Sequence, residues 1–180
     1  MNRFLPLALV ACSLAVTSAC GQDEAATAQN QPVAPVWIPF EDAVEAGKKS
    51  GKMVLVDVWS PRCGWCRKMQ EEVYTREDLL SYVNEHFVTG RLNIDVRDDT
   101  LSYLGYELSS ADLSVGFGAR GTPTTVFLSP DGSYITRLPG FHDYDSYFPV
   151  LRFIGTESFR EMTFQEFLDA TGETQKSGDR

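Results

Sequence analysis

The stretch VLVDVWSPRCGWCRKM, from Val54 to Met69, decides the fold of this chain. Its first half is a short apolar run rich in β-branched residues, which predicts a buried strand, and its second half predicts the start of a helix. Cys63 and Cys66 lie three positions apart at this junction, so we expect both sulfurs in the first helical turn. The unpaired N–H groups and the positive end of the helix dipole favour a thiolate there. The pattern therefore predicts a redox site.

The two cysteines are expected to have different roles. Cys63 comes first and should be the nucleophile, with Cys66 behind it as the resolving thiol. Three basic residues, Arg62, Arg67 and Lys68, stand next to the pair in a chain that is otherwise acidic. Their positive charge would favour the thiolate further.

A metal site is the main alternative for a cysteine pair. A structural zinc site needs four ligands, but the chain has no second cysteine pair and only two histidines, His86 and His142. Covalent haem attachment requires a histidine directly after the second cysteine, where this chain has Arg67. We therefore expect no metal and no cofactor.

Length and charge limit the remaining classes of function. A chain of 180 residues has room for one domain with a sizeable core, plus tails. The net charge of −9, without any basic stripe, argues against nucleic acid as a partner. Of the four cysteines, Cys12 and Cys20 precede the domain, so the chain is not a disulfide-stapled scaffold.

The N-terminal residues have the pattern of an export signal. Arg3 precedes an apolar run, and the small residues 17–19 lead directly to Cys20. Small residues before a cysteine resemble the lipobox of bacterial lipoproteins, so residues 1–19 are predicted to be removed and Cys20 to be lipidated. Ordinary cleavage after Ala28 is the alternative.

The rest of the chain divides into a tether, a domain and a tail. Residues 20–35 are rich in Ala, Gln and Asn and predict a flexible tether. The domain is expected over residues 36–170, followed by a polar, disordered tail over residues 171–180. Apolar patterns in the domain predict helices at 40–46, 64–73, 76–86, 111–120, 144–154 and 159–170, and strands at 54–59, 87–96, 125–128 and 134–138.

The connections predict how these strands pair. A helix lies between the first two strands, so they should be parallel and joined by a right-handed crossover. A Pro-Asp-Gly turn at residues 130–132 makes the last two strands an antiparallel hairpin. Residues 97–110 have no clear period and are expected to form an inserted surface loop or a short helix.

This order of elements, with a cysteine pair at the first strand–helix junction, resembles the thioredoxin fold. Asp57 falls where thioredoxins keep a buried carboxylate, and Arg91 replaces the Lys that usually faces it. Thr122 and Pro123 match the loop that holds a cis-proline opposite the cysteines. The resemblance implies an α/β protein with a central mixed sheet flanked by helices and an insert before the cis-proline loop.

The resemblance also implies roles for individual residues. Asp57 would accept the proton of Cys66 through a water molecule if burial raises the pKa of its carboxyl group. A strand-end aspartate with a satisfied hydrogen bond is the alternative. Pro123 would close the site and expose the backbone of Thr122 to a substrate strand, and Trp65 would shape the surface that meets the substrate.

The similarity extends to exported bacterial thioredoxin-like proteins, such as those of sulfur-oxidation gene clusters and the C-terminal domain of the disulfide interchange protein DsbD. It implies a monomeric, exported thiol–disulfide oxidoreductase on the periplasmic side of the membrane, tethered through Cys20. Such an enzyme would reduce disulfides of partner proteins and be kept reduced by a membrane electron donor of the DsbD type. A disulfide oxidase or isomerase, and a non-catalytic binding module with this fold, are the alternatives.

Overall fold

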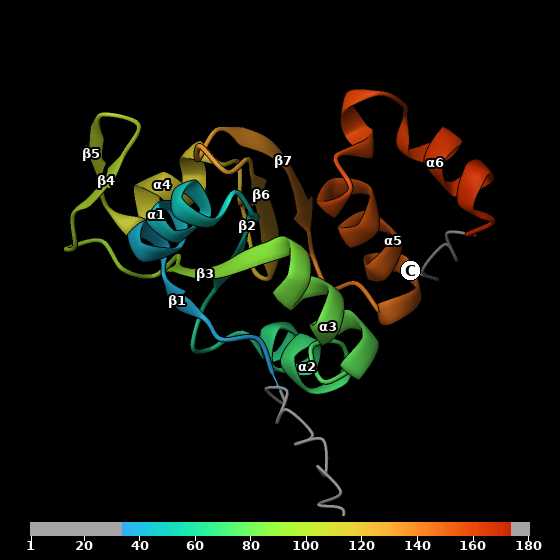
Figure 1. Ribbon diagram of the computed structural model, residues 1–180. Helices are drawn as coiled ribbons and strands as arrows, with labels where there is room; N and C mark the ends of the chain where they lie inside the picture. The colour runs from blue at the N-terminus through green and yellow to red at the C-terminus, as the bar shows by residue number, and fades with distance from the viewer. Residues whose placement is uncertain (1–33, 174–180) are drawn as a thin grey trace, which may run out of the picture. The chain divides into compact units, whose positions relative to one another are not determined.

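The computed structural model describes residues 34–173 (Figure 1). The predicted export signal over residues 1–19 and the predicted lipidation site, Cys20, lie outside the described residues, as do most of the tether and most of the tail. In the part of the chain that the structure describes, no helix is long and apolar enough to cross a membrane.

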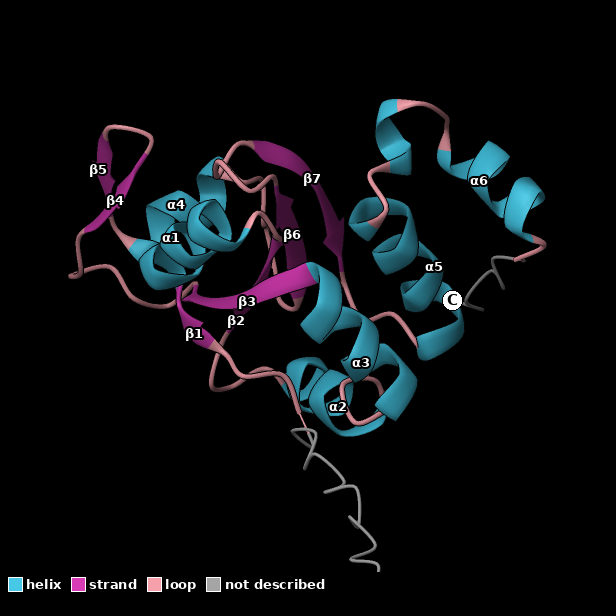
Figure 2. Cartoon of the chain, viewed as in Figure 1, coloured by secondary structure: helices cyan, strands magenta, loops and turns pink. Residues whose placement is uncertain are grey.

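Within residues 34–173, a five-stranded mixed sheet forms the centre of the domain (Figure 2). Its strands are β1 (Ile38–Pro39), β2 (Met53–Trp59), β3 (Phe87–Asn93), β6 (Thr124–Leu128) and β7 (Tyr134–Pro139), in the order β1-β3-β2-β6-β7. β3 is parallel to β1 and β2, whereas β6 is antiparallel to both β2 and β7. The predicted parallel pair and the predicted hairpin are confirmed.

Helices cover both faces of this sheet. They are α1 (Phe40–Ser50), α2 (Gly64–Glu72), α3 (Glu77–His86), α4 (Ser110–Gly116), α5 (Tyr144–Gly155) and α6 (Phe164–Thr171), with a short 3₁₀ helix, η1 (Ser158–Arg160), before α6. α1 and α4 pack on one face, and α2, α3 and α5 pack on the other (Figure 1). This arrangement confirms the α/β fold class, a central mixed sheet flanked by helices.

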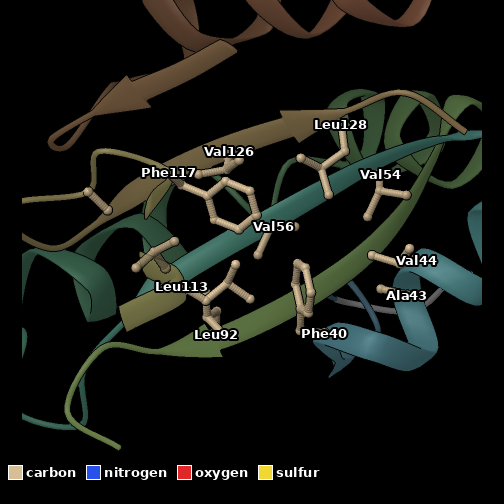
Figure 3. Close-up of a cluster of buried hydrophobic side chains, with 12 residues drawn as sticks. Phe40, Ala43, Val44, Val54, Val56, Leu92, Leu113, Phe117, Val126 and Leu128 are labelled. Carbon is tan, nitrogen blue, oxygen red and sulfur yellow. The ribbon is translucent and has the colours of Figure 1, made fainter. Parts of the chain in front are cut away.

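The central strand β2 contributes to both cores because successive side chains of a strand point to opposite faces. Val54 and Val56 pack with Phe40 of α1 and with Phe117, which follows α4 (Figure 3). Leu55 points the other way, into the core formed with α2, α3 and α5. Burial on both faces explains why β2 is apolar at every position except Asp57 rather than alternating.

The first helix is longer than the predicted segment. It was expected to end at Gly47, but it continues to Ser50 and ends at Gly51, which has a left-handed φ of 74°. Gly47 has another function, since a Cβ atom there would lie 2.5 Å from Cγ2 of Val54. A glycine at this position lets α1 approach β2 closely.

The insert over residues 97–110 contains regular strand structure and is not only a loop or a short helix. It contains a β-hairpin, β4 (Leu101–Tyr103) and β5 (Tyr106–Leu108), with Gly105 at a φ of 85° in the turn (Figure 2). Tyr103 fastens the hairpin by donating a 2.8 Å hydrogen bond to a backbone carbonyl between β6 and β7. Strands of three residues are too short to show a period of two in the sequence.

The last predicted helix begins later than expected. Residues 158–160 form η1, and α6 begins only after Thr163, whose side chain accepts a hydrogen bond from the backbone N–H of Glu166. The side chain of Glu166 bonds back to the backbone of Thr163, which completes a capping box. α6 ends at Thr171, the first residue of the predicted tail.

Candidate active site

Cys63 and Cys66 form a disulfide at the N-terminus of α2. Cys63 is the N-cap residue, and its Sγ accepts a 3.0 Å hydrogen bond from the backbone N–H of Cys66. Cys63 is 9% exposed and Cys66 only 3% exposed. The pair lies at the start of the helix as predicted, and Cys63 is the more exposed of the two residues.

The loop that leads to the cysteines is fastened by Asp95. Ser60 Oγ donates a 2.7 Å hydrogen bond to Asp95, and Arg62 forms an ion pair of 3.2 Å with the same carboxylate. The hydrogen bond from Ser60, followed by the charge of Arg62, lowers the pKa of the Asp95 carboxyl group. We expected the positive charge of Arg62 to act on the cysteine pair, but Arg62 also forms an ion pair with the Asp95 carboxylate.

Asp95 was not predicted as a site residue, although its place in the sequence, at the end of a predicted strand, indicates that it lies near the cysteines. It follows β3, which is parallel to β2, and the carboxyl ends of adjacent parallel strands meet at one edge of a sheet. A polar residue two positions after the end of β3 therefore lies close to the loop that follows β2. Phe141, which lies beside Trp65, carries no comparable signal.

An aromatic patch borders the cysteine pair. The ring of Trp65 lies 5.4 Å from the ring of Phe141, and Nζ of Lys68 lies 5.1 Å and 5.0 Å from their centres. Trp65 is 57% exposed. A large exposed tryptophan next to a reactive sulfur is suited to contact a partner, and the cation over its ring stabilises its orientation.

Asp57 is the buried carboxylate that the resemblance implies. It is 2% exposed, and Nε and Nη2 of Arg91 donate hydrogen bonds of 3.1 Å and 3.0 Å to its Oδ2. Burial raises the pKa of the Asp57 carboxyl group, and the charge of Arg91 offsets part of that rise. Asp57 is two residues after Leu55 in β2, so it lies on the face of the sheet that α2 covers.

A buried group of hydroxyls lies on the same face. The hydroxyl of Tyr147 is 2.8 Å from that of Tyr74 and 3.2 Å from Oγ1 of Thr125. Thr125 pairs with Asp57 across β2 and β6. Burial is the main cause that raises the pKa of Tyr147, so its hydroxyl stays protonated. The sequence gives no sign of this group, since its members are far apart along the chain.

The loop before β6 lies at the same end of the sheet as the cysteines. The Thr122–Pro123 peptide bond is cis, as the resemblance implies. β2 and β6 pair Val58 with Thr124, which brings the residues after β2 and those before β6 to one edge. Among residues 34–173, no hydrogen bond uses the backbone of Thr122. Its N–H and C=O groups therefore have no hydrogen-bond partner among the described residues.

The arrangement is suited to thiol–disulfide exchange. It combines a cysteine pair at a helix start, a buried carboxyl group with a raised pKa, and a surface that can accept a peptide. Over residues 34–173, no group of three or more His, Cys, Asp or Glu side chains is arranged to hold a metal ion. The structure therefore brings the predicted residues to one end of the sheet, while their individual roles remain predictions.

Comparisons with known proteins agree with this architecture. Residues 40–155 match a family model described as a thioredoxin-like domain. A solved structure of a thioredoxin from Thermus thermophilus is 24% identical, with a TM-score of 0.55 over 67% of this chain and 87% of that one. At that identity the structural likeness shows the fold alone.

Two curated relatives are similar over most of the domain. The chain is 22% identical over 139 residues to the disulfide bond reductase DsbH of Chlamydia pneumoniae, which covers 73% of this chain and 82% of that protein. It is 26% identical over 139 residues to an uncharacterized protein of Caenorhabditis elegans, covering 76% of this chain. The chain spans only 18% of the length of the latter.

Proposed function

This chain belongs to the thioredoxin-like domain family, and from that premise we propose that it is a thiol–disulfide oxidoreductase that reduces disulfides of partner proteins. The observation that carries the proposal is the position of the Cys63–Cys66 pair at the start of α2, with Cys63 the more exposed. The relative from Chlamydia pneumoniae is named a disulfide bond reductase, which supports the reducing direction.

The reaction proceeds in two exchanges. The Cys63 thiolate attacks one sulfur of the substrate disulfide, forms a mixed disulfide and releases the other substrate sulfur, which takes a proton from solvent. Cys66 then loses its proton and attacks Sγ of Cys63. The Cys63–Cys66 bond forms, the second substrate thiol leaves, and two electrons have passed to the substrate.

Asp57 acts in the second exchange. A carboxylate whose pKa is raised by burial is a better proton acceptor than an ordinary aspartate, and it can accept the proton of Cys66 through a water molecule. Trp65 contacts the substrate, and the backbone of Thr122, next to Pro123, pairs with the substrate strand.

The equilibrium redox potential of the cysteine pair tests the direction of electron flow. The protein is equilibrated in glutathione buffers, quenched with acid and alkylated, and the dithiol fraction is measured by mass spectrometry. A potential near about −270 mV, the value for thioredoxin, supports a reductase, whereas a value near about −120 mV assigns an oxidase. Failure of the dithiol form to reduce any protein disulfide would favour the binding module instead.

We also propose that the enzyme is exported and acts at the periplasmic side of a membrane. In an oxidising compartment a dithiol enzyme stays reduced only if a donor supplies electrons, and we assign this role to a membrane protein of the DsbD type. Lipid chains on Cys20 would anchor the monomeric domain by about 0.8 kcal/mol per buried CH₂. Fractionation of cells carrying wild type or Cys20→Ala tests the anchor, and a wild type found wholly in the soluble exported fraction rejects it.

A further inference from the structure

A pocket of about 330 Å³ adjoins the loop before β6. Its lining includes Thr122 and Pro123 from that loop, Gly140, which follows β7, and two arginines, Arg120 and Arg137. The N–H of Gly140 donates a 2.8 Å hydrogen bond to the carbonyl of Pro123, so the two walls are joined. The pocket is therefore continuous with the backbone that would pair with a substrate strand.

The two arginines of this pocket differ from most others in the domain. In the described part of the chain, ion pairs with carboxylates are formed by Arg62, Arg76, Arg91, Arg152 and Arg160. Within those same residues, the side chains of Arg120 and Arg137 form no ion pair and donate no hydrogen bond, and both residues are exposed. Two positive charges that line one pocket repel each other, and an anion bound there would relieve this repulsion.

Arg137 is placed at the pocket wall by a close contact with Gly118. A Cβ atom on Gly118 would lie 2.6 Å from Nη1 and 2.7 Å from Cζ of Arg137. Gly118 also has a φ of +74°, which other residues rarely adopt. The glycine thus leaves room for the guanidinium group, which rests against the backbone at residue 118.

We propose that Arg120 and Arg137 are specificity-determining residues that bind a carboxylate carried by the disulfide substrate, close to the cysteine under attack. This inference rests on the proposed function. A guanidinium group presents paired donors that match the two oxygens of a carboxylate. Because the chain has a net charge of −9, it does not attract acidic partners in general. Recognition of an acidic substrate must therefore come from a local site such as this pocket.

The test compares two peptide disulfides that differ only in a Glu or a Lys beside the cysteine. Single-turnover reduction by the dithiol form is followed at low salt by acid quench and mass spectrometry. We expect the wild type to react about five-fold faster with the Glu peptide, and Arg120→Ala/Arg137→Ala to lose this preference. Lys48→Ala/Lys49→Ala changes the net charge equally but lies on α1, outside the pocket lining, and should keep the preference.

Further variants separate charge from folding defects. Arg120→Ala alone leaves β7 unchanged and should lose part of the preference. Arg137→Lys retains the charge and should retain most of the preference, whereas Arg137→Glu should reverse it in favour of the Lys peptide. Raising the salt concentration should reduce the preference of the wild type, because exposed charges are screened.

The carboxylate can come from an acidic side chain of a polypeptide or from a small disulfide such as oxidised glutathione. A loss of rate in the double variant with the Glu peptide identifies the polypeptide, and a loss with oxidised glutathione alone identifies the small molecule. Equal rates of the wild type with both peptides, together with an unchanged glutathione rate in the double variant, overturn the inference and leave the proposed function intact. Failure to reduce any of these disulfides overturns the proposed function itself.

Discussion

Asp57 and Arg91 occupy paired positions in the parallel strands β2 and β3, and Nη2 of Arg91 lies 3.0 Å from Oδ2 of Asp57. Their environments differ, since the side chain of Asp57 is 3% exposed and that of Arg91 is 26% exposed. The carboxylate loses its hydration, whereas the guanidinium keeps part of its own. Burial is therefore the larger effect on Asp57 and raises the pKa of its carboxyl group despite the neighbouring cation.

We predict that Asp57→Asn is more stable than the wild type at pH 7. Because the pKa of Asp57 is raised in the folded state, its contribution to stability is present below the pKa of the unfolded chain, about 3.9. That contribution is lost as the pH rises through the folded-state pKa. Urea unfolding between pH 3.5 and pH 8 should thus show a difference that grows with pH. A variant less stable than the wild type at pH 7 would mean that the ion pair with Arg91 stabilises the fold by more than the burial of the Asp57 carboxylate costs.

Asp95→Asn is the matched control and should show the opposite sign. The pKa of Asp95 is lowered, chiefly by the hydrogen bond from Ser60, so its contribution to stability is present at neutral pH. It disappears as the pH falls through the lowered pKa. Asp95→Asn should therefore be less stable than the wild type at pH 7, and the two should converge at low pH.

In the dithiol form, Cys63 should be alkylated much faster than Cys66. Cys63 is the more exposed of the two, and its sulfur accepts the N–H of Cys66 at the helix start, which favours the thiolate. Brief treatment with iodoacetamide at pH 6, followed by mass spectrometry, measures both rates. Equal labelling of the two thiols would contradict the assignment of Cys63 as the nucleophile.

Cys66→Ser should accumulate mixed disulfides between Cys63 and substrate proteins, because the resolving exchange is removed. Adducts that migrate separately on a non-reducing gel and disappear with reductant are expected in cells that express the variant. The double variant Cys63→Ser/Cys66→Ser is the control and should form none. Adducts of equal yield in that control would show that they do not involve the proposed nucleophile.

Tyr147→Phe should destabilise the fold more than Tyr74→Phe. Tyr147 contacts both Tyr74 and Thr125 through its hydroxyl, so its removal leaves two buried hydroxyls without this partner. Removal of the Tyr74 hydroxyl leaves Tyr147 bonded to Thr125. An unsatisfied buried polar group costs about 1–3 kcal/mol, and denaturant unfolding at pH 7 resolves such a difference. Equal losses of stability in the two variants would show that the hydrogen bond between Tyr147 and Thr125 does not contribute to stability.

Gly90→Ala should lower the free energy of unfolding by about 1–3 kcal/mol, because the added methyl group overpacks the core. A Cβ atom at Gly90 in β3 would lie 2.6 Å from Cβ of Ala43 in α1. Gly116→Ala is the control, since a Cβ atom there has no atom within 4 Å and its φ is not positive. This control should be neutral or slightly stabilising by denaturant unfolding. A neutral Gly90→Ala would mean that α1 can move away from the sheet.

Local patterns along the chain predict the central part of the fold and the place of the cysteine pair in it. The apolar run of β2 and the cysteine spacing after it predict a strand and a helix start from local patterns alone. The resemblance to thioredoxins implied that Asp57 is buried and that the bond before Pro123 is cis. The structure shows both features. Hydrophobic periodicity and turn residues are local properties, so they are readable along the chain.

The contacts between residues far apart along the chain are visible in the folded structure and not in the sequence. The contact of Trp65 with Phe141, the anchoring of Ser60 by Asp95 and the placement of Arg137 against Gly118 each join segments that are far apart in sequence. The β4–β5 hairpin likewise depends on Tyr103 packing against the domain rather than on its own short strands. The residues next to a side chain in the sequence do not indicate its distant partner. Sheet register and helix packing set these contacts only once the whole core has formed.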